Sequence, residues 1–156
     1  MNRLITLSGS APLDEMHFRS ARLHESLSEN STGTVSLESD SATLNADDFL
    51  GKTLCLAFET RAQSLRYFDG VIVEMEQASQ AAGGHCSYRL ELKSWTWLLG
   101  KNQEFRVYQN KSVTAIVAEV IARHGHSAVR FSDRTQGVKR VWDYVVQFGE
   151  SDLNFV

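Results

Sequence analysis

Most of the first hundred residues follow the two-residue period of β-strands that have one apolar face. Leucine, valine and aromatic residues alternate with polar residues in five stretches: Ala21–Leu27, Val35–Glu38, Leu54–Phe58, Val71–Glu76 and Tyr88–Lys93. Residues 80–85 are rich in Gly and Ala, so the last two stretches should form an antiparallel hairpin. Residues 1–9 predict a further, first strand. Five or more short strands with one polar face favour a β-barrel or a sandwich, because closing a sheet removes its exposed edges.

One stretch after residue 100 has the 3.6-residue period of an amphipathic helix. Its apolar stripe consists of Val113, Ile116, Val117, Val120 and Ile121. Ser112 is a suitable N-cap, and Gly125 suits the position that follows a helix C-terminus. We therefore predict a helix from Ser112 to Arg123, the only long one in the chain.

The C-terminal residues predict a last strand and the start of another helix. Four apolar residues, Trp142, Tyr144, Val146 and Phe148, alternate with Asp143, Val145 and Gln147. This pattern predicts a strand near residues 141–148 that buries the side bearing these four apolar residues. Gly149 ends the strand, and Ser151 or Asp152 is the N-cap of a helix that has room for about one turn. Because so short a helix is unstable alone, we interpret the chain as the N-terminal fragment of a longer protein.

These patterns divide the chain into two parts. Residues 1–100 predict a β-barrel-like domain, and residues 101–156 predict the start of an α+β domain, with one more short strand around Val129 and Phe131. Trp95 and Trp97 would share a face if the preceding strand continued past Lys93. We interpret them as a lid on the core at the junction of the two parts, with a subunit contact as the alternative, since tryptophan is enriched at interfaces.

The composition is that of an ordinary globular protein, with 42% hydrophobic and 22% charged residues. Sixteen basic and 19 acidic residues give a net charge of −3, which argues against nucleic-acid binding. Apolar runs are much shorter than the roughly 18 residues of a membrane-spanning helix. The N-terminus is too short and too alternating for a signal peptide, so we expect synthesis in the cytoplasm and export only through a dedicated machine.

Candidate chemistry is sparse, and we predict no catalytic, cofactor-binding or metal-ligating residue. His124 and His126 come closest to a metal pair, but histidine is also favoured at a helix C-terminus for electrostatic reasons. Glu74 and Glu76 share a strand face and resemble a carboxylate pair, although such residues are more often plain surface charges. Cys55 and Cys86 are far apart in sequence, and we interpret them as packed free thiols.

Four stretches follow one another in the order and spacing of a known family. They are Arg66–Ile72, Tyr88–Leu99, Arg106–Val113 and the C-terminal Gln147-Phe148 with Glu150–Leu153 and Phe155. Together they resemble the VgrG spike proteins of type VI secretion systems, and also the baseplate-hub and late-control proteins of contractile phage tails. The resemblance covers most of residues 66–156, whereas residues 1–61 match loosely.

The resemblance implies a structural role in which the full-length protein forms a homotrimer at the tip of a contractile tube. It also implies a hexameric, Hcp-like tube protein, baseplate components and effector proteins as partners. No cofactor and no nucleic acid are implied, and the target membrane would be met only through the assembled spike. Such a protein is made in the cytoplasm, loaded on the injection apparatus and secreted or delivered into target cells. A phage or prophage tail hub is the alternative function, and an unrelated β-rich binding domain is a third.

Overall fold

The computed structural model describes residues 5–60, 62, 64–80, 85–125 and 131–156, and it divides the chain into two compact units. The first unit, residues 1–95, contains six strands: β1 (Ile5–Gly9), β2 (His17–His24), β3 (Thr32–Ser39), β4 (Thr53–Glu59), β5 (Leu65–Gln80) and β6 (Cys86–Lys93). A short 3₁₀ helix, η1 (Ala46–Asp48), precedes β4. These strands confirm the mainly antiparallel β structure predicted for this part.

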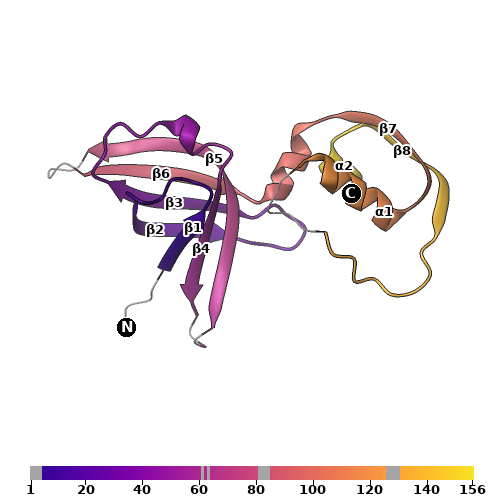
Figure 1. Ribbon diagram of the computed structural model, residues 1–156, viewed down its shortest axis with the longest axis horizontal. Helices are drawn as coiled ribbons and strands as arrows, with labels where there is room; N and C mark the ends of the chain where they lie inside the picture. Colours follow the sequence, from indigo (N-terminus) through magenta and orange to yellow (C-terminus); the bar gives the residue numbers. More distant parts are fainter. Residues whose placement is uncertain (1–4, 61, 63, 81–84, 126–130) are drawn as a thin grey trace. The chain divides into compact units, whose positions relative to one another are not determined.

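The six strands form one curled antiparallel sheet in the order β1-β4-β5-β6-β3-β2 (Figure 1). The 16-residue strand β5 holds the sheet together, because Leu65–Val71 pair with β4 and Val71–Gln80 pair with β6. The predicted hairpin is therefore formed by β5 and β6. The sheet is half-barrel-like, with β1 and β2 at its two ends.

The core of this unit contains many of the predicted apolar positions, together with Phe49 and Phe68, which the alternating pattern did not predict. Its buried members include Val35, Leu37, Phe49, Leu54, Leu56, Phe68, Ile72, Tyr88, Leu90 and Leu92. β5 comes close to the side chain of Leu92 at Gly70, and a Cβ on residue 70 would lie only 2.9 Å from the Cβ of Leu92. Glycine is therefore required at this position. The predicted strand through Leu27 is wrong at its end. β2 stops at His24, so Leu27 lies beyond it and is 96% exposed.

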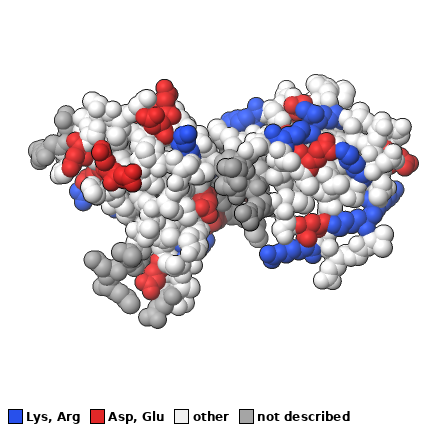
Figure 2. Space-filling view, viewed as in Figure 1, with Lys and Arg blue, Asp and Glu red and all other residues white. Residues whose placement is uncertain are grey.

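The opposite side of the sheet is polar, as the alternation predicts. Two cross-strand ion pairs lie on it, Arg19 with Glu38 at 2.5 Å and Arg89 with Glu76 at 3.0 Å, and a third pair joins Lys93 to Glu91 within β6 at 2.7 Å. Acidic side chains prevail on this unit and basic ones on the second unit (Figure 2). The net charges are −5 for residues 1–95 and +2 for residues 96–156, so the overall −3 conceals two units of opposite sign.

The second unit, residues 96–156, contains β7 (Glu104–Ser112), α1 (Val113–Arg123), β8 (Val141–Glu150) and α2 (Asp152–Phe155). Helix α1 confirms the predicted helix, with Ser112 as N-cap and Gly125 in the left-handed region at φ 59°. Strands β7 and β8 pair as a two-stranded antiparallel sheet. The core beneath α1 is small and consists of Tyr108, Ile116 and Val120, with Val145 and Phe155 against it.

Three predictions in this region are wrong. Trp95 and Trp97 are not in a strand, because Ser94 ends β6 and residues 95–101 form a 3₁₀ helix, η2 (Trp95–Lys101). Phe131 lies outside any strand, and Val129 lies outside the described residues. The aromatic side of β8 is exposed rather than buried, because α1 packs on the other side of the sheet, against Val145 and Tyr108. Within the part of the chain that the structure describes, no helix is long and apolar enough to cross a membrane.

Candidate functional site: a buried carboxylate and an open sheet face

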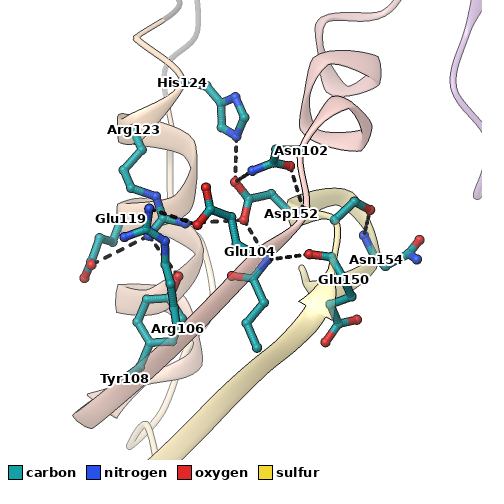
Figure 3. Close-up of polar contacts among 12 residues, drawn as sticks. Asn102, Glu104, Arg106, Tyr108, Glu119, Arg123, His124, Glu150, Asp152 and Asn154 are labelled. Carbon is teal, nitrogen blue, oxygen red and sulfur yellow. Dashed lines mark hydrogen bonds and ion pairs between the residues drawn. The ribbon is translucent and has the colours of Figure 1, made fainter.

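The polar centre of the second unit is the carboxylate of Asp152, which is 1% exposed. Its position follows from the local chain geometry. Gly149 adopts a φ of 62° at an irregularity in the β7–β8 register, so β8 continues to Glu150 instead of ending at Gly149 as predicted. Ser151 then caps α2 by accepting a hydrogen bond from the Asn154 backbone N–H at 3.2 Å. The turn directs Asp152 inward, beneath the end of α1 (Figure 3).

Four side chains donate to the two oxygens of this carboxylate (Figure 3). Gln147 Nε2 and Arg123 Nη2 lie 2.8 and 3.3 Å from Oδ1. Asn102 Nδ2 and His124 Nε2 each lie 2.8 Å from Oδ2. The backbone N–H of Asp152 donates in turn to Asn102 Oδ1 at 3.2 Å. These contacts join β8, the end of α1 and the segment before β7 to the start of α2.

The Asp152 carboxyl is ionised at neutral pH. Burial raises its pKa, but hydrogen bonds from Gln147, His124 and Asn102 and the charge of Arg123 outweigh that effect, so its pKa lies below the ordinary 3.8. An ionised carboxylate only accepts hydrogen bonds, so His124 Nε2 carries the proton that it donates. The group therefore makes four charge-assisted hydrogen bonds, which are stronger than neutral ones.

Arg123 extends this cluster to the small core. Its Nη1 donates to Tyr108 Oη at 2.9 Å and lies 3.9 Å from Glu119. The Tyr108 ring stacks on Phe155 with 5.5 Å between centroids. Burial lowers the pKa of the Arg123 guanidinium, but its bond to Tyr108 and the charges of Asp152 and Glu119 leave it above the usual value. The cation is thus fixed between its anions and an aromatic ring.

Gln147 has one polar atom that the chain does not satisfy. Its side chain is fully buried, and Nε2 donates both to Asp152 and to the backbone oxygen of Glu150 at 3.1 Å. Among the described residues, no donor reaches its Oε1. A buried amide oxygen of this kind is normally satisfied by an ordered water, so we expect one at this position.

The Asp152 cluster binds its own chain rather than presenting reactive groups. Both carboxylate oxygens are occupied by donors, and the described side chains around it include no hydroxyl or thiol nucleophile that contacts His124. In the described ranges, no three His, Cys, Asp or Glu side chains gather as metal ligands do. His124 contacts Asp152, and His126 lies outside the described residues, so the proposed alternative of a histidine pair has no described geometry.

The other candidate residues lie in the first unit as ordinary strand residues. Glu76 pairs with Arg89, and Glu74 lies opposite Glu91 in the register of β5 and β6. Burial raises the pKa of the Cys55 thiol to about 11, and a nearby Asp69 adds to the effect. Cys55 is therefore a thiol at neutral pH and a weak nucleophile.

The second notable feature is the side of the β7–β8 sheet that faces away from α1. It presents apolar side chains to solvent: Phe105, Val107, Trp142, Tyr144, Val146 and Phe148 are between 38% and 77% exposed. Phe105 and Phe148 contact each other edge to face, with centroids 5.2 Å apart. Apolar faces of this size on a protein surface indicate contact with another polypeptide.

Sequence reasoning found the helix that carries Arg123 and His124 but missed the cluster itself. It considered Asp152 only as an N-cap, a role that Ser151 has instead. One signal was present: Gln147 occupies the same side of β8 as Val145, the side that turned out to be buried. A polar residue in a buried phase requires a polar partner, and Asp152 was one of three acidic candidates nearby in the sequence, with Asp143 and Glu150.

This fold is similar to that of the hub domains of phage tail baseplates. The family model described as phage tail baseplate hub (GPD) matches residues 24–156. The chain belongs to this phage tail baseplate-hub family.

Relatives within the family are spike proteins. The chain is 35% identical over 122 residues to the type VI secretion system spike protein VgrG1c of Pseudomonas aeruginosa strain PAO1, and 30% identical over 154 residues to VgrG1b of the same strain. These matches cover 78% and 99% of this chain but only 16% and 20% of the relatives. The chain thus spans a fifth or less of their length.

Solved structures agree on the fold. The Escherichia coli c3393 protein, described as a type VI secretion component structurally similar to the T4 phage tail proteins gp27 and gp5, has a TM-score of 0.76 at 22% identity, over 96% of this chain and 41% of that one. One chain of the lidless PdpA–VgrG complex has a TM-score of 0.56 at 10% identity, over 94% of this chain and 28% of that one. Family membership excludes the alternative of an unrelated β-rich binding domain.

Proposed function

We propose that this chain is the hub portion of a type VI secretion spike, three copies of which assemble at the tip of a contractile tube. The observation that carries the proposal is the family match over residues 24–156 together with relatives that are spike proteins at 30–35% identity. The half-barrel sheet of the first unit supports it, since the solved type VI component shares this fold.

The proposed role is structural and involves no chemistry of its own. Two features support this. The buried polar cluster is occupied by donors from the same chain, and the relatives carry names of spike proteins rather than enzymes. In this role the chain would hold its partners in place and bear force between them.

The proposed partners are a hexameric tube protein, baseplate components and effector proteins. One structural neighbour is a chain of the PdpA–VgrG complex, which supports the idea that such hubs associate with additional proteins. The assembled spike, rather than this chain alone, would meet the target membrane. The protein would be synthesised in the cytoplasm and then loaded on the apparatus and secreted.

A deletion in the host tests this proposal. Removing the gene should abolish release of the tube protein into the medium, and an intact copy should restore it. Full-length product purified from the host should show three chains per particle by light scattering and should retain the tube protein in a pull-down. Normal release of the tube protein from the deletion strain would contradict the spike role.

A phage or prophage tail hub is the second candidate function. The specific observation in its favour is that the matching family is described by the phage tail protein. Prophage induction separates the two candidates: a deletion that removes infectious or tail-like particles but leaves tube-protein secretion intact would assign the chain to a phage tail.

A further inference from the structure

The β7–β8 sheet has one closed end and one open end. At the closed end Ser112 pairs with Val141, and the chain between these two residues runs through α1. At the open end the last pair is Glu104 with Glu150. The chain enters the sheet at this open end through β7 and leaves it at the same end through β8. Tension on the chain to either side of the sheet therefore acts on the open end first.

A two-stranded antiparallel ladder resists such tension poorly. Its hydrogen bonds run perpendicular to the strands, so a pull that separates the strands at one end acts along the bonds and breaks them one pair at a time. The register is also irregular between Glu104 and Phe105, next to the open end, and such an irregularity locally disrupts the ladder. Without a further contact, the open end is where the second unit would start to come apart.

Asn102 and Asp152 make that further contact. They lie just outside the open end, two residues before Glu104 and two residues after Glu150. Their contact is reciprocal: Asn102 Nδ2 donates to Asp152 Oδ2 at 2.8 Å, and the Asp152 backbone N–H donates to Asn102 Oδ1 at 3.2 Å (Figure 3). The side-chain amide of Asn102 thus donates one hydrogen bond and accepts one, as the backbone of a neighbouring strand does.

The Asp152 side of this contact is fixed to the rest of the second unit. The buried carboxylate also accepts hydrogen bonds from Gln147 of β8, from Arg123 at the end of α1 and from His124 just after it. Hydrogen bonds to an ionised group are stronger than the neutral bonds of the ladder. Asp152 cannot leave with the outgoing chain unless these bonds break as well, so several strong bonds have to break together.

We propose that Asn102 and Asp152 form a clip that closes the open end of the β7–β8 sheet. Tension between the chain before Asn102 and the chain after Asp152 passes across the clip, and the 49 residues between them are not unzipped. The incoming and outgoing segments also touch beside the clip, since a Cβ on Gly100 would lie 3.4 Å from Leu153 Cδ2.

The clip is independent of the proposed spike role. It depends only on contacts within the second unit of one chain, so it applies to a secretion spike and to a phage tail hub alike. Loss of tube-protein secretion in the host tests the spike role and leaves the clip untouched, so either proposal can fail alone.

Optical tweezers test the clip on the 156-residue chain, held by its two ends at constant force. Opening of residues 103–151 should lengthen the chain by roughly 160–180 Å in one step, since an extended chain spans about 3.3–3.6 Å per residue. Unfolding of residues 5–93 gives a step of roughly 290–320 Å, so the step length tells the two units apart. Asn102→Ala removes both hydrogen bonds between residues 102 and 152 and should raise the rate of the shorter step at least about tenfold at the same force.

Two control variants separate loss of the clip from a general loss of stability. Gln103→Ala changes the exposed neighbour of Asn102 and should leave the opening rate unchanged. Val120→Ala removes buried side-chain atoms beneath α1 and should lower the stability of the second unit in urea. It should nevertheless change the opening rate by less than about threefold, because the core is loaded only after the clip has opened.

Circular dichroism shows whether a variant that opens early is still folded without force. Asn102→Ala should keep the wild-type spectrum, because the β7–β8 ladder and the core beneath α1 remain. If that variant unfolds, Asn102→Ser supplies the same test, since the shorter side chain cannot make both hydrogen bonds to Asp152. Equal opening rates of the Asn102 variant and the wild type would overturn the proposal. Acceleration by Val120→Ala as large as that by the Asn102 variant would also overturn it.

Discussion

At the scale of single residues, the most informative group is the buried carboxylate of Asp152. It collects donors from three other segments, so one side chain fixes how β8, α1 and α2 meet. The two residues that the family resemblance highlighted near the C-terminus, Gln147 and Asp152, contact each other at 2.8 Å. The presence of both residues in this stretch thus has a structural explanation and requires no catalytic one.

Replacing Asp152 by Asn should destabilise the second unit by about 2–3 kcal/mol. The change keeps the shape of the side chain but removes its charge. It also replaces one accepting oxygen by an NH₂ group, which would face the donors of the surrounding side chains. Urea unfolding monitored by circular dichroism measures the loss. Asp143→Asn is the matched control, since Asp143 is exposed on β8 of the same unit and should change stability by less than about 0.5 kcal/mol. Equal stability of the two variants would contradict this role.

The same carboxylate should make stability depend on pH. Its pKa is lower in the folded chain than in the unfolded chain, where it titrates near 3.8. The stabilisation is therefore fully present above that unfolded value and is lost as the pH falls through the folded pKa. The difference in unfolding free energy between wild type and Asp152→Asn should shrink as the pH is lowered from about 6 toward 3. A difference that grows on acidification would show that the sign is wrong.

At the scale of secondary-structure elements, α1 depends on its cap as well as on its apolar stripe. The Ser112 hydroxyl accepts a hydrogen bond from the Ala115 backbone N–H at 3.3 Å. Ser112→Ala should therefore cost about 1 kcal/mol of unfolding free energy. Ser132→Ala, at an exposed position without regular structure, is the control and should be neutral. Thermal unfolding of both variants measures the difference.

The elements show which parts of the fold a sequence can predict. Helix α1 and the strands through Leu54, Leu90 and Val35 follow from periodicity, because their buried faces are covered by the same unit. Periodicity fixes which residues share a face but not which face is covered. For β8 the alternation correctly predicted which residues share a face. The face that α1 covers, however, is the one that carries Val145 and Gln147, and the face with the aromatic residues is exposed.

Two other misses have different causes, one local and one long-range. The alternation of Trp95 and Trp97 fits a strand, yet the backbone coils into η2 after Ser94, and Lys101 Nζ lies 3.9 Å from the centroid of the Trp97 ring. A cation held over a tryptophan three or four residues earlier needs a helical turn, and this contact is not visible in hydrophobic spacing. The Asp152 cluster was missed because its members are 50 residues apart in the chain, at Asn102 and Asp152.

At the scale of the whole molecule, the two units differ in the size of their cores. The buried cluster of the first unit has 13 residues, and that of the second has three. Backbone amides of α1 should therefore exchange with solvent faster than those of β6, because less buried apolar surface opposes local opening. Hydrogen exchange measured by mass spectrometry checks this. Equal protection in both units would contradict it.

The strand order of the first sheet also has a consequence for synthesis on the ribosome. Strand β3 pairs with β6, whose last residue, Lys93, is made 54 residues after Ser39. At translation rates of about 5–20 residues per second, the hairpin of β2 and β3 waits roughly 3–10 s for that neighbour. During this interval Val35 and Leu37 have no second partner strand, and an isolated two-stranded hairpin is marginally stable. The nascent chain thus passes through a period in which a chaperone that binds apolar strands has a defined target.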